Sequence, residues 1–320
     1  MTVAELLHQG VSALSQGDVS SAEASFRSAL DIDPDNANAH NNLGFALAQK
    51  QDWNNALIHL RSALSINPES SMTHCNLGQV LIALGDINNG MQHIDLAVEK
   101  DPENAIAWDS MARFRVLAGD YTTAEYAAQR AVGLAPRHSA FYVRLGIAQA
   151  AQRRFSEALR QYQMALELGP TNSEAWAQLG ITSFLMNNLG DAHKALTKAL
   201  ELAPRDSNAK RHLALCELAQ GDRDSAIQHF EQILAYSPED HATALELAVV
   251  YISQFRDDEA RSLMNSLPDD WHSAPRFKFY DALLRKREGD DESARQLLEQ
   301  LMQTDNDYAG KAAKLMESVH

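Results

Sequence analysis

The residues best suited to chemistry in this sequence are its histidines and its two cysteines. His40 and His74 stand 34 residues apart, and we expect them to approach each other if the chain repeats with that spacing. Two imidazoles do not complete a zinc site, which needs four ligands or three plus water. We therefore interpret both as packing residues that stand where an aromatic side chain usually lies. Cys75 and Cys216 are too isolated for a disulfide framework or a cysteine zinc site, and we expect them to be small buried or groove residues.

A cluster of aspartates at residues 31, 33 and 35 resembles the start of a calcium loop. Such a loop needs glycine at its sixth place and glutamate at its twelfth, where this sequence has Asn36 and Asn42. A glycine-rich phosphate loop, a nucleophile elbow and a His-Glu-x-x-His motif are also absent from the sequence. We therefore expect no catalytic residue, no metal and no cofactor.

The composition narrows the class of protein further. Of 320 residues, 45% are hydrophobic and 22% are charged, and the net charge is −15. This acidic balance argues against a nucleic-acid partner, which needs a basic face. The sequence has no apolar run of about 18 residues, and residues 1–10 lack the basic and apolar regions of a signal peptide. We expect a cytoplasmic globular protein that does not insert into membranes.

A period of 34 residues organises the whole sequence. Seven of the nine prolines recur at that interval, from Pro34 to Pro238. Nine units without insertion are predicted at residues 3–36, 37–70, 71–104, 105–138, 139–172, 173–206, 207–240, 241–274 and 275–308. Residues 309–320 follow as a predicted C-terminal capping helix. The eighth and twentieth places of every unit hold glycine or alanine.

The spacing of apolar residues in each unit predicts two amphipathic helices joined by a short turn such as Gly85-Asp86. Two antiparallel helices approach closely only where their side chains are small, and the eighth and twentieth places mark that crossing. The proline ends the second helix because it cannot continue the hydrogen-bond ladder. One hairpin cannot bury its own apolar face, but stacked hairpins can. The sequence therefore predicts an all-α, right-handed solenoid of nine helix-turn-helix units.

The spacing and small residues resemble the tetratricopeptide repeat (TPR) family, whose unit is 34 residues long. The sixth unit carries matching signature residues: Trp176, Leu179, Gly180, Ala192, Ala199 and Pro204. The resemblance covers essentially the whole chain and implies a concave groove lined by the first helix of each unit. In units two and three it places several polar residues and one aromatic residue in that groove: Asn38, Asn41, Asn42, Phe45, Asn76 and Gln79. Asparagines there either bond the backbone of an extended peptide or are merely solvated.

Units four and five form a weakly basic band in an acidic chain. The resemblance places Arg113 and Arg144 in the groove from adjacent units, where two guanidinium groups suit a partner's carboxylate. Pairing of these arginines with Asp109, or plain solvation, is the alternative. Three apolar residues extend the predicted groove: Ile147, Ile181 and Phe184. If these residues are exposed, they form a partner site that suits a helix, and otherwise they touch neighbouring helices.

Units eight and nine depart from the pattern, because His272 and Asn306 replace the closing proline. The stretch around Pro268 predicts that the second helix of unit eight ends early, and either repeat decay or a second partner surface accounts for the divergence. Our leading hypothesis is a non-enzymatic scaffold or adaptor that binds an extended or helical protein segment in the groove. The alternative is a structural or assembly-factor subunit of a secretion, cell-envelope or glycosyl-transfer complex, which self-associates as a homo-oligomer.

Overall fold

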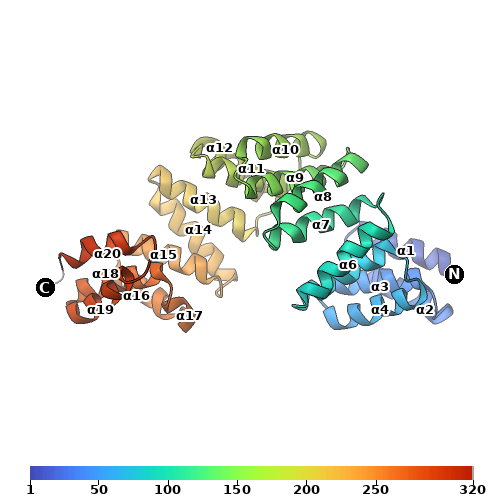
Figure 1. Ribbon diagram of the computed structural model, residues 1–320, viewed down its shortest axis with the longest axis horizontal. Coiled ribbons are helices and arrows are strands. Elements are labelled where there is room, and N and C mark those ends of the chain that lie inside the picture. Colours follow the sequence, from blue (N-terminus) through green and yellow to red (C-terminus); the bar gives the residue numbers. More distant parts are fainter. Residues whose placement is uncertain (319–320) are drawn as a thin grey trace. The chain divides into compact units, whose positions relative to one another are not determined.

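The computed structural model describes residues 1–318, and within that range every regular element is a helix (Figure 1). This confirms the all-α class predicted from the sequence. The chain forms two compact units, Met1–Gln178 and Leu179–His320, and the boundary between them falls inside α11 (Ser173–Leu185). None of the helices in the described residues is both long and apolar enough to cross a membrane.

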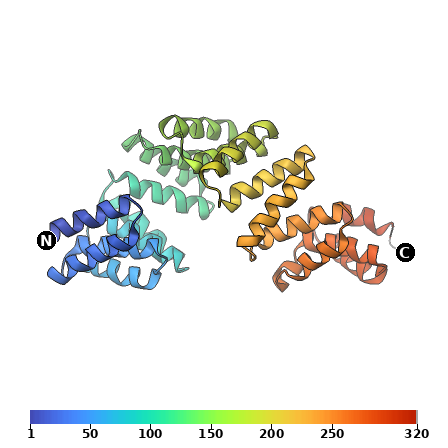
Figure 2. The same cartoon turned by 180° about the vertical axis from the view of Figure 1, so that it is seen from behind.

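The first compact unit is built from five helical hairpins. Its helices are α1 (Val3–Ser15), α2 (Val19–Ile32), α3 (Ala37–Gln49), α4 (Trp53–Ile66), α5 (Ser71–Ala83), α6 (Ile87–Lys100), α7 (Ala105–Leu117), α8 (Tyr121–Leu134), α9 (Ser139–Ala151) and α10 (Phe155–Leu168). Each odd-numbered helix packs against the even-numbered helix that follows it, and successive odd-numbered helices also contact one another. The odd-numbered helices therefore share one face, which we call the first-helix face (Figures 1 and 2).

The second compact unit continues with less regular hairpins. Its helices are α12 (Leu189–Leu202), α13 (Ser207–Gln220), α14 (Arg223–Tyr236), α15 (His241–Ser253), α16 (Asp257–Asn265), α17 (Asp269–His272), α18 (Pro275–Glu288), α19 (Asp291–Met302) and α20 (Ala309–Met316). The second helices α12 and α14 have 14 residues each, whereas α16 has nine. This confirms the early end predicted for the second helix of residues 241–274. Helix α20 packs on α19 at the place of the predicted cap, whose last two residues lie outside the described range.

The turns inside the hairpins explain where the helices begin. An aspartate directly before most second helices accepts a hydrogen bond from a backbone N–H of the first turn, as Asp86 does from Asn89. The preceding residue has positive φ in all nine hairpin turns. Five of these residues are glycines, and four are not: Gln51, Arg153, Asn187 and Phe255. Because L-residues are strained in this region, the turn geometry outweighs local preference at those four positions.

The helix crossings lie at the small residues that the sequence singled out. A Cβ atom added to Gly78 would lie 2.7 Å from the carbonyl oxygen of Gly90, so α5 and α6 touch backbone to backbone. A Cβ on Gly146 would lie 2.4 Å from the ring of Tyr162, which is fully buried under it. Close approach at these glycines lets large side chains from the second helix fill the core of each hairpin.

A shared hydrogen bond closes the turn before five of the first helices. In each, a side chain in the first turn of the helix donates to the carbonyl oxygen of the proline six residues earlier, over 2.8–3.1 Å. The donor and acceptor pairs are His40 and Pro34, His74 and Pro68, Trp108 and Pro102, Tyr142 and Pro136, and Trp176 and Pro170. His40 and His74 therefore make the same hydrogen bond as the tryptophans and the tyrosine of the other units, which agrees with our interpretation that they stand where an aromatic side chain usually lies.

The two histidines do not pair with each other. Instead, His40 Nδ1 lies 3.0 Å from His59 Nδ1, and His74 Nδ1 lies 2.9 Å from His93 Nδ1, each pair within one hairpin. Since Nε2 of His40 and of His74 donates to a carbonyl, their Nδ1 atoms accept, and His59 and His93 are the donors. Burial, with the neighbouring imidazole as a second cause, lowers the pKa of His59 and of His93.

Candidate functional site

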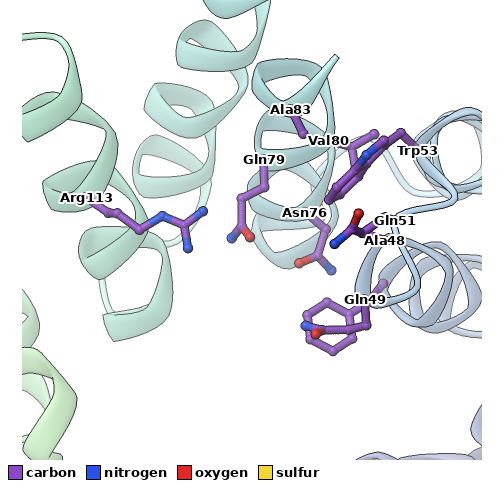
Figure 3. A pocket seen from close by; sticks show the side chains of 10 residues that line it. Ala48, Gln49, Gln51, Trp53, Asn76, Gln79, Val80, Ala83 and Arg113 are labelled. Atoms are coloured by element: carbon purple, nitrogen blue, oxygen red, sulfur yellow. The ribbon is translucent and has the colours of Figure 1, made fainter. Parts of the chain in front are cut away.

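An open cavity of about 290 Å³ lies on the first-helix face of α3, α5 and α7. Four of the residues predicted for the groove line it: Phe45, Asn76, Gln79 and Arg113. The other lining residues are Ala48, Gln49, Gln51, Trp53, Val80 and Ala83. In Figure 3, Arg113 and Gln79 extend toward each other from neighbouring helices, and the Trp53 ring lies beside Val80. The cavity thus combines an aromatic and apolar part with amides and one cation.

Amide groups form a hydrogen-bonded row along this face. Asn76 Nδ2 donates to Asn41 Oδ1 over 2.9 Å, and Asn41 Nδ2 donates to Asn42 Oδ1 over 3.1 Å. Asn76 is buried, whereas Asn41 and Asn42 are half-buried and Asn38 is exposed. Asn41, Asn42 and Asn76 are thus neither free nor merely solvated. They hold one another in place, and the unused amide atoms are presented in a fixed orientation.

A second polar group connects α5 to α7. Gln79 Nε2 donates to Ser110 Oγ over 3.1 Å, and Cys75 Sγ lies 3.1 Å from the same hydroxyl. Cys75 is fully buried, and burial raises the pKa of its thiol, so the sulfur stays protonated and unreactive at neutral pH. The cysteine is therefore a packing residue, as expected.

Arginine pairing on this face follows the alternative that the sequence left open. Arg144 Nε lies 3.4 Å from Asp109 Oδ1, and Arg144 Nη1 lies 3.6 Å from Glu174 Oε1. Burial raises the pKa of Asp109, and the positive charge of Arg144 opposes that rise. Because Arg144 already has two carboxylate neighbours, it does not form a clamp with Arg113 that is free to receive a third.

Arg113 is the cation that remains available. Its side chain is exposed, its guanidinium carbon lies 4.5 Å from the centre of the Phe114 ring, and no carboxylate lies within ion-pair distance in the described chain. Although the side chain as a whole is exposed, partial desolvation of the guanidinium, followed by the nearby charge of Arg144, lowers its pKa. A positive charge that is partly desolvated and unpaired favours an anionic ligand group.

The apolar residues predicted to extend the groove are all half-buried: Ile147 in the first compact unit, and Ile181 and Phe184 in the second. Sequence reasoning missed Gln51, which reaches the cavity from the turn after α3, and Trp53, the first residue of α4. The signal was present, because the first residue of the second helix is apolar in the first six units, from Val19 to Leu189. The described residues contain no group of His, Cys, Asp or Glu side chains that could hold a metal ion.

Comparisons with known proteins agree with this architecture. Models of the tetratricopeptide repeat match residues 115–180 and 217–278, 13–51, 37–70, 186–229 and 73–104. Comparison with curated protein sequences finds no match. Together the repeat models cover most of the chain.

Solved structures with the same fold include three TPR-like chains of low sequence identity. A tetratricopeptide repeat protein from Parabacteroides merdae is 18% identical with a TM-score of 0.60, over 78% of this chain and 98% of that one. A chain of the APC/C hetero-tetramer Cut9–Hcn1 is 17% identical with a TM-score of 0.70, over 93% of this chain and 55% of that one. A chain of the human IFIT1 dimer with m7Gppp-AAAA is 16% identical with a TM-score of 0.67, over 99% of this chain and 81% of that one. At this identity the likeness shows the fold alone, and with the repeat models it places the chain in the tetratricopeptide repeat family.

Proposed function

We propose that this protein is a non-catalytic scaffold that binds a segment of a partner protein along the first-helix face of α3, α5 and α7. The observation that carries this proposal is the 290 Å³ cavity, which joins an apolar part to fixed amides and an unpaired arginine. A groove of this kind suits a peptide, because amides bond its backbone and the apolar part receives a side chain.

The partner segment has an acidic or terminal carboxylate near an apolar side chain. Arg113 is the attractive element for that carboxylate, while Asp109 and Glu174, held by Arg144, repel a second acidic group placed further along the face. Phe45 and Trp53 provide the ring surfaces for the apolar side chain. The proposal needs no catalytic group, in keeping with a fold whose hairpins take up most of the chain.

Photo-crosslinking tests the location of the partner. A benzophenone amino acid replaces Gln49, which lines the cavity, and in a control it replaces Gln163, which is exposed on the second helix α10. We expect a specific crosslinked partner only from the Gln49 position, and Arg113→Gln should reduce its yield while Arg160→Gln, an exposed arginine of α10, should not. Equal products from both positions would contradict the proposal, and a crosslink to a second copy of the chain would favour self-association.

A further inference from the structure

A second cavity, of about 450 Å³, lies between the second helices α14 and α16, above the first helix α15. Its floor consists of Leu247 and Tyr251, which are buried, and its sides consist of Leu234 and Leu263, which are half-buried. It is within the size range of ligand pockets. All of its residues lie in the second compact unit and none belongs to the first-helix cavity, so it is a separate surface.

Two short side chains open this cavity. Ala235 and Ser262 line it, whereas the residues four repeat lengths earlier, Glu99 of α6 and Tyr126 of α8, are much larger. The floor differs as well, since Tyr251 stands where the earlier hairpin has an arginine. Ala235 belongs to residues 207–240 and Ser262 to residues 241–274, and their short side chains leave the hollow between α14 and α16 unfilled.

The rim of the cavity is acidic. Glu231 accepts a hydrogen bond from Tyr251 Oη over 2.7 Å, and in the described chain it has no lysine or arginine within ion-pair distance. Glu259 forms an ion pair with Arg256, whose Nε lies 3.0 Å from Glu259 Oε1. The guanidinium carbon of Arg256 also lies 4.0 Å from the centre of the Tyr251 ring. Acidic residues outnumber basic ones in residues 207–240 and again in residues 241–274. A ligand with a positive charge beside an apolar group complements this surface.

We propose that this cavity binds a basic segment of a partner protein, with one large apolar side chain between Leu234 and Leu263 and an adjacent lysine or arginine on Glu231. The inference goes beyond the proposed function, because it assigns a second docking surface for a partner of opposite charge to the one that Arg113 attracts. The hollow is open to solvent, so a side chain of a peptide that lies across α14 and α16 can enter it.

Short labelled peptides test this proposal by fluorescence anisotropy. The probe is Lys-Lys-Trp-Lys-Lys amide, and the two reference peptides replace its tryptophan with alanine or its lysines with glutamate. Burial of the indole should make the probe bind about tenfold more tightly than the alanine peptide. The glutamate peptide should not bind, because Glu231 and Glu259 repel it. Equal affinity for the tryptophan and alanine peptides would overturn the proposal, since only surface charge would then be at work.

Variants of the cavity separate its two contributions. Ser262→Trp fills the hollow and should abolish the preference for the tryptophan peptide. Glu231→Gln keeps an acceptor for the Tyr251 hydroxyl, removes the charge, and should weaken the probe severalfold. Glu239→Gln, an exposed residue outside the cavity, is the matched control and should change nothing. If Ser262→Trp does not fold, Glu231→Gln against Glu239→Gln still decides, and equal effects of these two variants would refute the site.

Discussion

In hairpin α5–α6 the two helices cross at Gly78 and Gly90, whereas α15 and α16 cross at Ala248 and Ala260, which are both fully buried. The glycine crossing brings backbone against backbone, and the alanine crossing places two buried methyl groups there. The same antiparallel hairpin therefore forms with either pair of small residues. What differs is the contact at the crossing, which is backbone in one hairpin and methyl groups in the other.

The two hairpins also differ in the polar contacts that hold them to their neighbours. Around α5, the contacts are neutral hydrogen bonds such as that from His74 to the Pro68 carbonyl. Around α15 and α16, arginines replace them: Arg261 pairs with Asp281 and, over 2.9 Å, with Glu288, and Arg276 pairs with Glu246 over 2.6 Å. Charged contacts between successive hairpins are not confined to this region, since Arg115 of α7 lies 2.6 Å from Asp95 of α6, but here they connect α18 to both α15 and α16.

The largest expected effect comes from the glycine crossing. Gly78→Ala places a methyl group against the carbonyl oxygen of Gly90, and because backbone cannot move aside we expect a loss of about 3 kcal/mol in the free energy of unfolding. Urea unfolding followed by circular dichroism measures it. Gly133→Ala is the control, since it lies in the helix α8 with open space around it and should gain up to about 1 kcal/mol. Equal effects of the two substitutions would show that the crossing is not tight.

The charged contacts of the second region provide the next effect. Asp281 is buried and accepts hydrogen bonds from both Arg261 and Arg285. Asp281→Asn leaves two guanidinium groups without their shared carboxylate, and we expect a loss of about 2 kcal/mol in the free energy of unfolding. Asp269→Asn, a fully exposed aspartate, should have no measurable effect on the same unfolding curve. No difference between these variants would mean that the network does not stabilise α16 and α18.

Much of this architecture could be predicted from the sequence, because the 34-residue period, the small residues and the closing prolines report helix packing directly. The early end of α16 was predictable for the same reason, since Pro268 and its acidic neighbours interrupt the second helix. Individual side-chain partners were predictable only in part. Pairing of Arg144 with Asp109 was one of the alternatives that the sequence left open. The contact of Arg144 with Glu174 and the pairing of His40 with His59 depend on helix rotation and rotamers that no spacing encodes. The cavity beside α16 depends likewise on which positions face the gap.

The histidine pairs of the first region predict a pH dependence. The folded protein holds the pKa of His59 and of His93 below 6.5, so the unfolded chain binds protons more readily as the pH falls through that value. The free energy of unfolding should therefore decrease as the pH falls from about 7 to 5. The double variant His59→Asn with His93→Asn keeps a side-chain donor at each place and should have a flatter profile. If the free energy of unfolding depends on pH with the same slope in the two proteins, His59 and His93 do not cause the pH dependence.

The smallest effect concerns the turns that join the paired helices. Gly85 and Phe255 occupy the same place in hairpins α5–α6 and α15–α16, with φ of 89° and 59°. The left-handed conformation costs a phenylalanine about 1–2 kcal/mol, and a glycine avoids that strain. The greater conformational freedom of glycine in the unfolded chain offsets roughly 0.5–1 kcal/mol of this gain. Phe255→Gly should therefore raise the free energy of unfolding by about 0.5 kcal/mol, measured in urea.

The ring of Phe255 is exposed and lies 4.6 Å from the guanidinium carbon of Arg287, so the substitution also removes a cation–π contact. Arg153→Gly provides the matched comparison, because Arg153 has a similar φ of 61° and makes no cation–π contact in the described residues. We expect Arg153→Gly to stabilise slightly more than Phe255→Gly. If Phe255→Gly destabilises while Arg153→Gly stabilises, the contact with Arg287 outweighs the strain, and the α15–α16 turn is held by its neighbour α18 rather than by its own backbone.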